Sequence, residues 1–178
     1  MNHTSLDTRN WLFPAALEGR APDTVSLTVG GWMTAPVKSV HPNTAVPEAY
    51  NLMLLHGIRR LPVVDEGGLI GIVTLGDLRE ARPSSVVVPS LYELSYLLAR
   101  ATVTQVMTHH PFTVTVQTPL REAADLMRTH KIGSLPVVAD ENRLVGILTE
   151  SDLFRMFMAR WDATLAATPA TGGTEGGV

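Results

Sequence analysis

The chain has 178 residues, of which 45% are hydrophobic, 14 are Lys or Arg and 17 are Asp or Glu. This length and apolar content suffice for a packed core, which excludes intrinsic disorder for most of the chain. The net charge of −3 offers no electrostatic footprint for nucleic acid or for an anionic membrane surface. The absence of cysteine excludes disulfides, thiolate metal sites and cysteine nucleophiles.

The two ends of the chain differ in character from its middle. Residues 1–27 are expected to form an irregular N-terminal extension, and no basic leader precedes the short apolar patch at 12–17. No apolar run approaches the roughly 18 residues that a membrane span needs. Residues 161–178, rich in Thr, Ala and Gly, are expected to be a flexible tail after a helix that ends near Trp161. We therefore expect a cytoplasmic protein without a membrane segment.

The middle of the chain contains two copies of one unit. When residues 28–64 are aligned with 102–138, 16 of the 37 positions are identical, including Met33 with Met107 and Met53 with Met127. One inserted residue, Ala139, then changes the offset from 74 to 75, and eight further positions agree. The predicted domains are repeat 1 at 28–80, a connector at 81–101 and repeat 2 at 102–160.

Each repeat is predicted to run strand, helix, strand, strand, helix. Thr44 and Thr118 are expected N-caps of the first helices, which carry apolar residues at helical spacing. A hairpin follows in each copy, at 61–74 and 135–149, and a second helix begins after it. Units of about 50 residues bury too little surface to be stable alone, so we expect an α/β (α+β) fold in which the two repeats pack as a pair. In the connector, the capping-box pattern at 90–93 predicts a helix.

The hairpins end in a doubled motif, Gly-apolar-x-Thr-x-x-Asp, at 71–77 and 146–152. One interpretation is structural: Thr and an acidic residue three positions later cap any helix. The other is a nucleoside site, because a helix start offers free N–H groups and a carboxylate accepts hydrogen bonds from ribose hydroxyls. The two interpretations are compatible.

An arginine pair, Arg59-Arg60, precedes the hairpin of repeat 1, and its counterpart in repeat 2 is the neutral pair Gly133-Ser134. Such a pair is either solvated surface charge or a phosphate-binding group. If these positions line ligand sites, the first site is better suited to phosphate than the second.

The Met-Thr starts, the Ile-x-x-Leu-Pro-Val-Val blocks and the doubled Gly-x-x-Thr-x-x-Asp motifs resemble a tandem pair of CBS domains, the cystathionine-β-synthase-type regulatory module. The connector, with Pro83-Ser84 and Tyr92-Glu93-Leu94, is similar to that of stand-alone bacterial CBS pairs of the acetoin-utilisation type. The resemblance implies a Bateman module, in which two repeats associate about a pseudo-twofold axis and bind AMP, ADP, ATP or S-adenosylmethionine in clefts between them.

The resemblance also implies roles for particular residues. Asp77 and Asp152 would accept the ribose hydroxyls, and Thr74 and Thr149 would bond ribose or phosphate. Arg59 and Arg60 lie where relatives bind phosphate, whereas Gly133 and Ser134 depart from that pattern. The adenine would be flanked by four apolar residues, Ile58, Pro62, Ile132 and Pro136.

The remaining polar residues indicate neither a metal site nor a catalytic one. His56 and His130 lie at helix ends, and the adjacent pair His109-His110 cannot share one helix face. No Ser, His and acid constellation stands out, so we expect no enzyme activity and no required cofactor. The last helix carries a bulky stripe, Leu153, Phe154, Phe157 and Trp161. The stripe either packs against the connector or the N-terminal extension, or forms a partner surface; we favour the partner surface, because in relatives two CBS pairs commonly form a homodimer through such helices.

Two hypotheses follow. The first is a non-enzymatic, homodimeric sensor that binds an adenosine nucleotide and relays its occupancy to an unidentified regulated protein. The alternative is an interaction scaffold with degenerate clefts, in which the doubled motif only caps helices and the stripe around Phe154 and Trp161 binds another protein.

Overall fold

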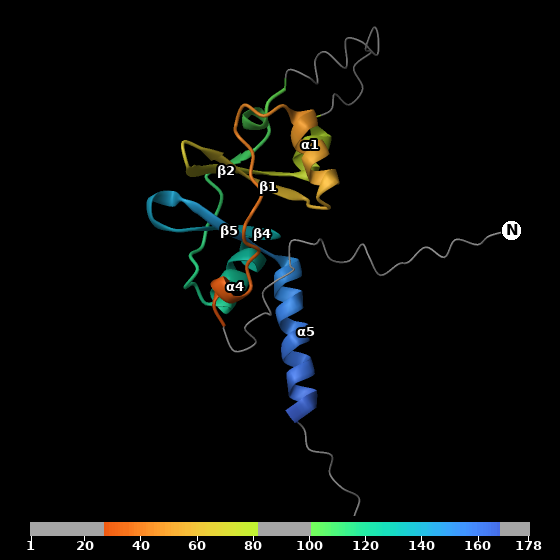
Figure 1. Cartoon of the computed structure of the whole chain (residues 1–178), viewed down its shortest axis with the longest axis vertical. Coiled ribbons are helices and arrows are strands. Elements are labelled where there is room, and N and C mark those ends of the chain that lie inside the picture. The colour runs from red at the N-terminus through yellow and green to blue at the C-terminus, as the bar shows by residue number, and fades with distance from the viewer. Residues whose placement is uncertain (1–26, 82–100, 168–178) are drawn as a thin grey trace, which may run out of the picture.

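The structure, a computed structural model, describes residues 27–81 and 101–167 (Figure 1). The predicted N-terminal extension, the predicted helix in the connector and the end of the predicted tail lie outside these residues. The described part is a mixed α/β fold in which the two repeats lie one above the other, with the last helix extending away from them (Figure 1). Within the described ranges, no helix combines the length and the apolar character that a bilayer crossing requires.

The predicted hairpins are present in both repeats. In repeat 1, β1 (Arg60–Asp65) pairs with β2 (Gly68–Thr74), which places Arg60 opposite Thr74. In repeat 2, β4 (Ser134–Val138) pairs with β5 (Leu144–Thr149), which places Ser134 opposite Thr149. The start of each hairpin therefore lies beside the threonine of the doubled motif.

The predicted first strand of each repeat is reduced to a single parallel bridge, Val40 to Val63 and Val114 to Val137. Proline lacks the N–H that a longer ladder needs, and prolines flank Val40 at 36 and 42 and precede Val114 at 111. A short strand of repeat 2, β3 (Thr108–His109), instead pairs with β2 of repeat 1. The sheet of repeat 1 thus contains a strand from the other repeat.

The first helices, α1 (Val46–Leu55) and α4 (Leu120–His130), are capped one residue later than predicted, by Ala45 and Pro119. The hydroxyls of Thr44 and Thr118 accept hydrogen bonds from backbone N–H groups three residues earlier, at 3.2 and 3.0 Å. These threonines close the preceding turn instead of the helix.

The second helices are α2 (Leu75–Glu80) and α5 (Glu150–Ala167). The structure corrects the predicted end of α5 near Trp161, because the helix continues to Ala167. The sequence from 162 to 167, Asp-Ala-Thr-Leu-Ala-Ala, contains four strong helix formers, which favours this extension.

The opening segments of the two repeats are exchanged. The 3₁₀ turn η2 (Val29–Gly31) of repeat 1 packs in the core of repeat 2, and η3 (Val103–Gln105) of repeat 2 packs in the core of repeat 1. Backbone bonds of 2.9 Å fix both segments, from Val29 N–H to Thr118 and from Val103 N–H to Thr44. The two repeats therefore form one interlocked structure and not two separable packing units.

The exchange explains why the methionine and the glycine of each repeat recur. A Cβ on Gly71 would lie 2.5 Å from the sulfur of Met107, and a Cβ on Gly146 would lie 2.7 Å from the sulfur of Met33. Real Cβ atoms do not approach a neighbour so closely, so each glycine makes room for the methionine of the other repeat. The doubled Met and Gly are packing partners across the pair.

Candidate functional site

The first copy of the motif forms a complete helix cap. Thr74 ends β2, and its hydroxyl accepts a hydrogen bond from the N–H of Asp77 at 3.3 Å. Oδ2 of Asp77 accepts a hydrogen bond from the N–H of Thr74 at 2.7 Å. The predicted capping interpretation is therefore confirmed for repeat 1. Among the described residues, the other oxygen of Asp77 has no hydrogen-bond partner.

The second copy is enclosed in a denser network. Asp152 is only 4% exposed, and its Oδ2 accepts hydrogen bonds from the N–H of Thr149 at 2.8 Å and from its hydroxyl at 2.7 Å. Its Oδ1 lies 3.4 Å from the hydroxyl of Thr34 and 3.2 Å from the guanidinium of Arg155. Both oxygens of Asp152 are thus engaged inside the protein.

Arg155 ties this network to the opening segment of repeat 1. Its guanidinium donates to the carbonyl oxygen of Trp32 at 2.6 Å and lies 5.9 Å from the centre of the Trp32 ring. Burial raises the pKa of Asp152 above its ordinary value of 3.8, although the hydrogen bonds from Thr149 and the charge of Arg155 oppose that rise. The counterpart of Arg155 in repeat 1 is Glu80, so repeat 1 cannot form the same pair.

A hollow of about 580 Å³ lies between the two repeats. Its lining is partly apolar, with Ile72, Ile132 and Phe112, and it includes five predicted site residues. These five are Arg60, Thr74, Ile132, Gly133 and Ser134. Arg60 of repeat 1 and the neutral residues Gly133 and Ser134 of repeat 2 therefore line the same hollow. The sequence had suggested that they belong to two separate sites.

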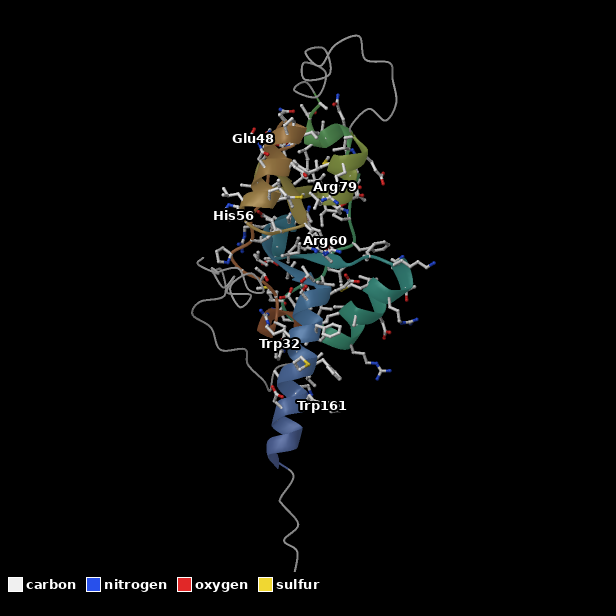
Figure 2. All side chains as sticks on the ribbon, turned by 90° about the vertical axis from the view of Figure 1, so that its right-hand side faces the viewer. Trp32, Glu48, His56, Arg60, Arg79 and Trp161 are labelled. Atoms are coloured by element: carbon white, nitrogen blue, oxygen red, sulfur yellow. The ribbon has the colours of Figure 1, made fainter. Side chains whose placement is uncertain are left out.

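A second hollow of about 560 Å³ shares Arg60 and Thr74 with the first. It is lined by three arginines, Arg59, Arg60 and Arg79, together with Thr74, Leu75 and Gly76. Figure 2 shows Arg60 at the level where the two repeats meet, with Arg79 close above it. A partly apolar hollow and a cationic one thus meet at Arg60.

Arg60 also crosses from repeat 1 to repeat 2. Its guanidinium lies over Gly133, where a Cβ would collide with it, and 3.7 Å from Oε2 of Glu150. The side chain of Arg60 is 28% exposed, and that of Glu150, at the first position of α5, is 68% exposed. The small residue at 133 is what allows this arginine to reach the other repeat.

Three predicted adenine-flanking residues lie elsewhere. Pro62 and Pro136 are buried inside β1 and β4, and Ile58 packs against the core of repeat 1. None of the three lines either hollow. Asp77 and the second-copy pair, Thr149 and Asp152, are likewise not among the lining residues.

Several lining residues were not predicted from the sequence. Arg79 follows Thr74 by five residues on α2, and the stretch Thr108–Phe112 enters the first hollow because β3 pairs with β2. The ring of Phe112 stacks on His130 with centroids 4.0 Å apart. Arg79 could have been noticed as a third arginine near the Arg59-Arg60 pair, but the position of Phe112 depends on a pairing between the repeats.

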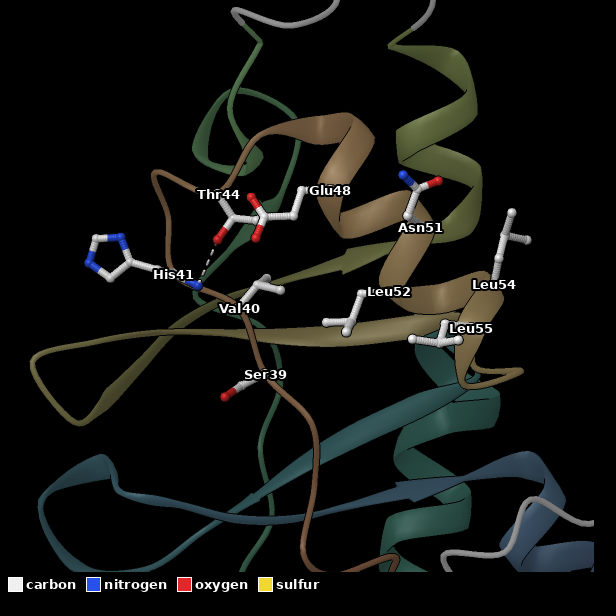
Figure 3. A pocket seen from close by; sticks show the side chains of 9 residues that line it. All are labelled: Ser39, Val40, His41, Thr44, Glu48, Asn51, Leu52, Leu54 and Leu55. Carbon is white, nitrogen blue, oxygen red and sulfur yellow. Dashed lines mark hydrogen bonds between the residues drawn. The ribbon is translucent and has the colours of Figure 1, made fainter.

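A third hollow of about 760 Å³ is larger than these two and lies away from the doubled motif, between α1 and the segment 39–44 (Figure 3). Its wall includes Val40, His41 and the exposed Leu54 and Leu55. It contains no predicted site residue and has no cationic cluster, so size alone does not identify the functional site. Within the described ranges, no three His, Asp or Glu side chains gather as metal ligands would.

Solved structures of similar proteins contain adenosine compounds. The chain is 30% identical to CBSX2 of Arabidopsis thaliana, whose structure in complex with AMP covers 76% of this chain and 99% of that one with a TM-score of 0.64. The CBS domain pair of protein MJ0100, in complex with 5′-methylthioadenosine and S-adenosyl-L-methionine, is also 30% identical, with a TM-score of 0.63 and coverage of 75% and 97%. The acetoin utilization protein AcuB of Vibrio cholerae is 32% identical, with a TM-score of 0.66 and coverage of 82% and 100%.

Curated relatives are of two sizes. The chain is 31% identical to the L-aspartate semialdehyde sulfurtransferase of Methanocaldococcus jannaschii over 126 residues, but spans only 22% of that protein. It is 32% identical over 136 residues to the CBS domain-containing protein YhcV of Bacillus subtilis and spans 89% of it. The chain thus spans most of one relative and less than a quarter of the other.

The profile of the CBS domain matches residues 29–84 and 103–159, which together make up more than half of the chain. These two ranges overlap the two copies found within the sequence. The interlocked α/β repeats, the doubled motif and the similarity to solved CBS pairs agree with this match. The chain therefore belongs to the CBS domain family and contains a tandem CBS pair.

Proposed function

We propose that this chain binds an adenosine-containing nucleotide at the first copy of the motif and that the bound nucleotide regulates a partner protein. One observation carries the proposal: the partly apolar hollow with Ile72, Ile132 and Phe112 shares Arg60 with the hollow lined by three arginines. A nucleotide presents an apolar base at one end and an anionic phosphate at the other, and it needs both environments side by side.

Two relatives support the class of ligand. CBSX2 was solved with AMP, and the CBS pair of MJ0100 with 5′-methylthioadenosine and S-adenosyl-L-methionine. All of these compounds contain adenosine, which favours an adenosine compound as the ligand for a cleft of this family. The three arginines favour a phosphorylated adenosine here, because guanidinium groups bind phosphate through paired hydrogen bonds.

The proposal assigns one part of the ligand to each part of the cleft. The base would lie against Ile72, Ile132 and Phe112, the ribose near Thr74 and the free oxygen of Asp77, and the phosphate against the arginines. The second motif would not hold a ribose in the same way, because Thr149, Thr34 and Arg155 already engage both oxygens of Asp152. We therefore propose one principal site for a phosphorylated ligand.

Isothermal titration with AMP, ADP, ATP and S-adenosylmethionine tests the proposal. We expect heat with at least one of them and a stoichiometry near one per chain. The Asp77→Ala variant should bind more weakly, whereas Asp65→Ala, at the turn end of the β1–β2 hairpin and away from Thr74 and Arg60, serves as a control for loss of a carboxylate. No heat with any of the four ligands, from folded and ligand-free protein, would contradict the proposal.

We also propose that α5 mediates a homodimer. Its apolar side chains are unusually exposed: Phe154 by 72%, Phe157 by 54% and Trp161 by 56%, and the last two rings lie 5.9 Å apart. Exposed clusters of this kind are typical of protein interfaces. In Figure 1, α5 extends beyond the body of the repeats, which leaves this stripe accessible to a second chain.

Light scattering coupled to gel filtration tests the dimer. We expect a dimer for the wild type and a monomer for the double variant Phe157→Asp and Trp161→Asp. Leu27→Asp makes the same kind of change at a leucine that is 54% exposed and lies outside α5, and it should leave the dimer intact. A monomeric wild type that captures another protein through Trp161, without regard to nucleotide, would instead support the scaffold hypothesis.

A further inference from the structure

The contact between Arg60 and Glu150 joins the two repeats at the point where the two hollows meet. The Nη2 atom of Arg60 lies 3.7 Å from Oε2 of Glu150, and Arg60 lines both hollows. We infer that Glu150 is an internal anion that competes with the ligand's phosphate for Arg60; this inference rests on the proposed function. Glu150 would thereby lower the affinity for phosphorylated ligands and leave that for adenosine unchanged.

The local geometry makes the two anions compete. Arg60 is held over Gly133, next to Glu150, and the backbone N–H of Glu150 donates to the carbonyl oxygen of Gly133 at 3.2 Å. A phosphate bound by Arg60 would therefore lie close to a carboxylate on a fixed piece of backbone. The phosphate and the nearby carboxylate of Glu150 would repel each other. A guanidinium already paired with a carboxylate also attracts a second anion less strongly.

The competing carboxylate belongs to one repeat only. The counterpart of Glu150 in repeat 1 is Leu75, and the counterpart of Arg60 in repeat 2 is Ser134, so the symmetric contact has neither charge. Glu150 is also the first residue of α5, the helix with the exposed Phe157 and Trp161. A phosphate that displaces the Glu150 side chain from Arg60 would therefore act at the first residue of the proposed dimer helix.

Titration of AMP and of adenosine into wild type and Glu150→Gln tests the competition. We expect the variant to bind AMP about two- to fivefold more tightly, the size of a partly exposed ion pair, and adenosine with less than a 1.5-fold change. Glu122→Gln makes the same chemical change on the exposed side of α4 and should alter neither affinity. Thermal unfolding of each variant verifies that it is folded.

A double-mutant cycle separates direct competition from a general change in charge. In the Arg60→Gln background, Glu150→Gln should strengthen AMP binding much less than in the wild type, because the group for which the two anions compete is gone. An equal gain in both backgrounds, or weaker AMP binding by Glu150→Gln alone, overturns the inference. If the wild type gives no heat with AMP, ADP, ATP or S-adenosylmethionine, the proposed function fails as well; if it binds a phosphorylated ligand and only the gain is missing, the inference alone fails.

Discussion

The two copies of the Thr-x-x-Asp motif have the same residues but different surroundings. Asp77 caps α2 and leaves one oxygen without a partner among the described residues, beside a hollow lined by three arginines. Asp152 is buried and engages both oxygens with Thr149, Thr34 and Arg155. The motif alone therefore specifies a helix start, and residues outside it decide whether that start is open to a ligand.

The deciding residues are those at which the repeats differ. Arg60 corresponds to Ser134, Arg79 to Phe154 and Glu80 to Arg155. The first two differences concentrate positive charge at the cleft of repeat 1, and the third lets repeat 2 neutralise its own aspartate. These differences support the proposal that the first copy binds the ligand, whereas Arg155 ties the second copy to the opening segment of repeat 1.

The largest effect is expected from Arg155. Arg155→Met leaves Asp152 buried without its cation and removes the donor to the carbonyl of Trp32, so we expect the free energy of unfolding to fall by about 3 kcal/mol. Glu80→Gln, at the equivalent position of repeat 1, should change it by less than about 0.5 kcal/mol. Urea denaturation of both variants measures the difference. Equal losses would mean that the two copies are held by similar forces.

The repeats should respond alike where they are packed alike. Gly71→Ala and Gly146→Ala each press a new Cβ against a methionine of the other repeat and against a backbone oxygen 3.0 or 3.1 Å away, so each should cost about 2 kcal/mol. Gly68→Ala is the control, because its nearest neighbour lies 3.7 Å away. Urea denaturation compares the three, and a loss confined to one of the two motif glycines would contradict the exchanged packing.

A smaller effect is expected at Arg79. Arg79→Gln removes one of three cations from an exposed cleft, so AMP should bind about five- to tenfold more weakly while adenosine is affected less than twofold. Arg128→Gln removes an exposed arginine from α4, away from the cleft, and controls for net charge. Titration calorimetry with both ligands distinguishes the two variants. Similar losses for AMP and adenosine would argue against phosphate at the three arginines.

Patterns within each repeat predicted most of the fold. The hairpins follow the β-branched runs after Ile58 and Ile132, and the cap of α2 follows the Thr-x-x-Asp spacing. Two local predictions failed for local reasons: the threonines at 44 and 118 close turns ahead of their helices, and α5 is longer than its polar tail suggested. The exchange of the opening segments could not be predicted, because either core accepts Val29 or Val103 equally well on hydrophobicity.

The candidate site was also predictable only in part, because contacts between the repeats cannot be read from either repeat alone. Arg60, Thr74 and Gly133 were selected from their positions in the repeats, and they do line one hollow. The sequence comparison assigned Gly133 to a second site, whereas pairing between the repeats brings it beside Arg60. Arg59 and Arg60 are not repeated in the other copy, but they form an adjacent pair that could be noticed. Phe112 and Arg79 are not repeated either, since Lys38 and Phe154 stand in the other copy, and no local pattern marks them. Repetition reveals the shared scaffold, and a residue unique to one cleft is found only where a local pattern marks it.

The smallest expected effect is a change in how the free energy of unfolding depends on pH, and it arises at Asp152 in the second copy of the motif. Because burial raises the pKa of Asp152 in the folded state, the native protein holds this proton more tightly than the unfolded chain does. The contribution of this difference to the free energy of unfolding is fully present below the ordinary carboxyl pKa of 3.8. It is lost as pH rises through the higher pKa of Asp152 in the folded protein. Asp152→Asn lacks this contribution, so its deficit in unfolding free energy relative to wild type should be larger at pH 4 than at pH 7. Urea denaturation at unit pH steps measures this deficit. A deficit that grows with pH would mean that Thr149 and Arg155 together outweigh burial, and that the second aspartate is held as a stabilised anion.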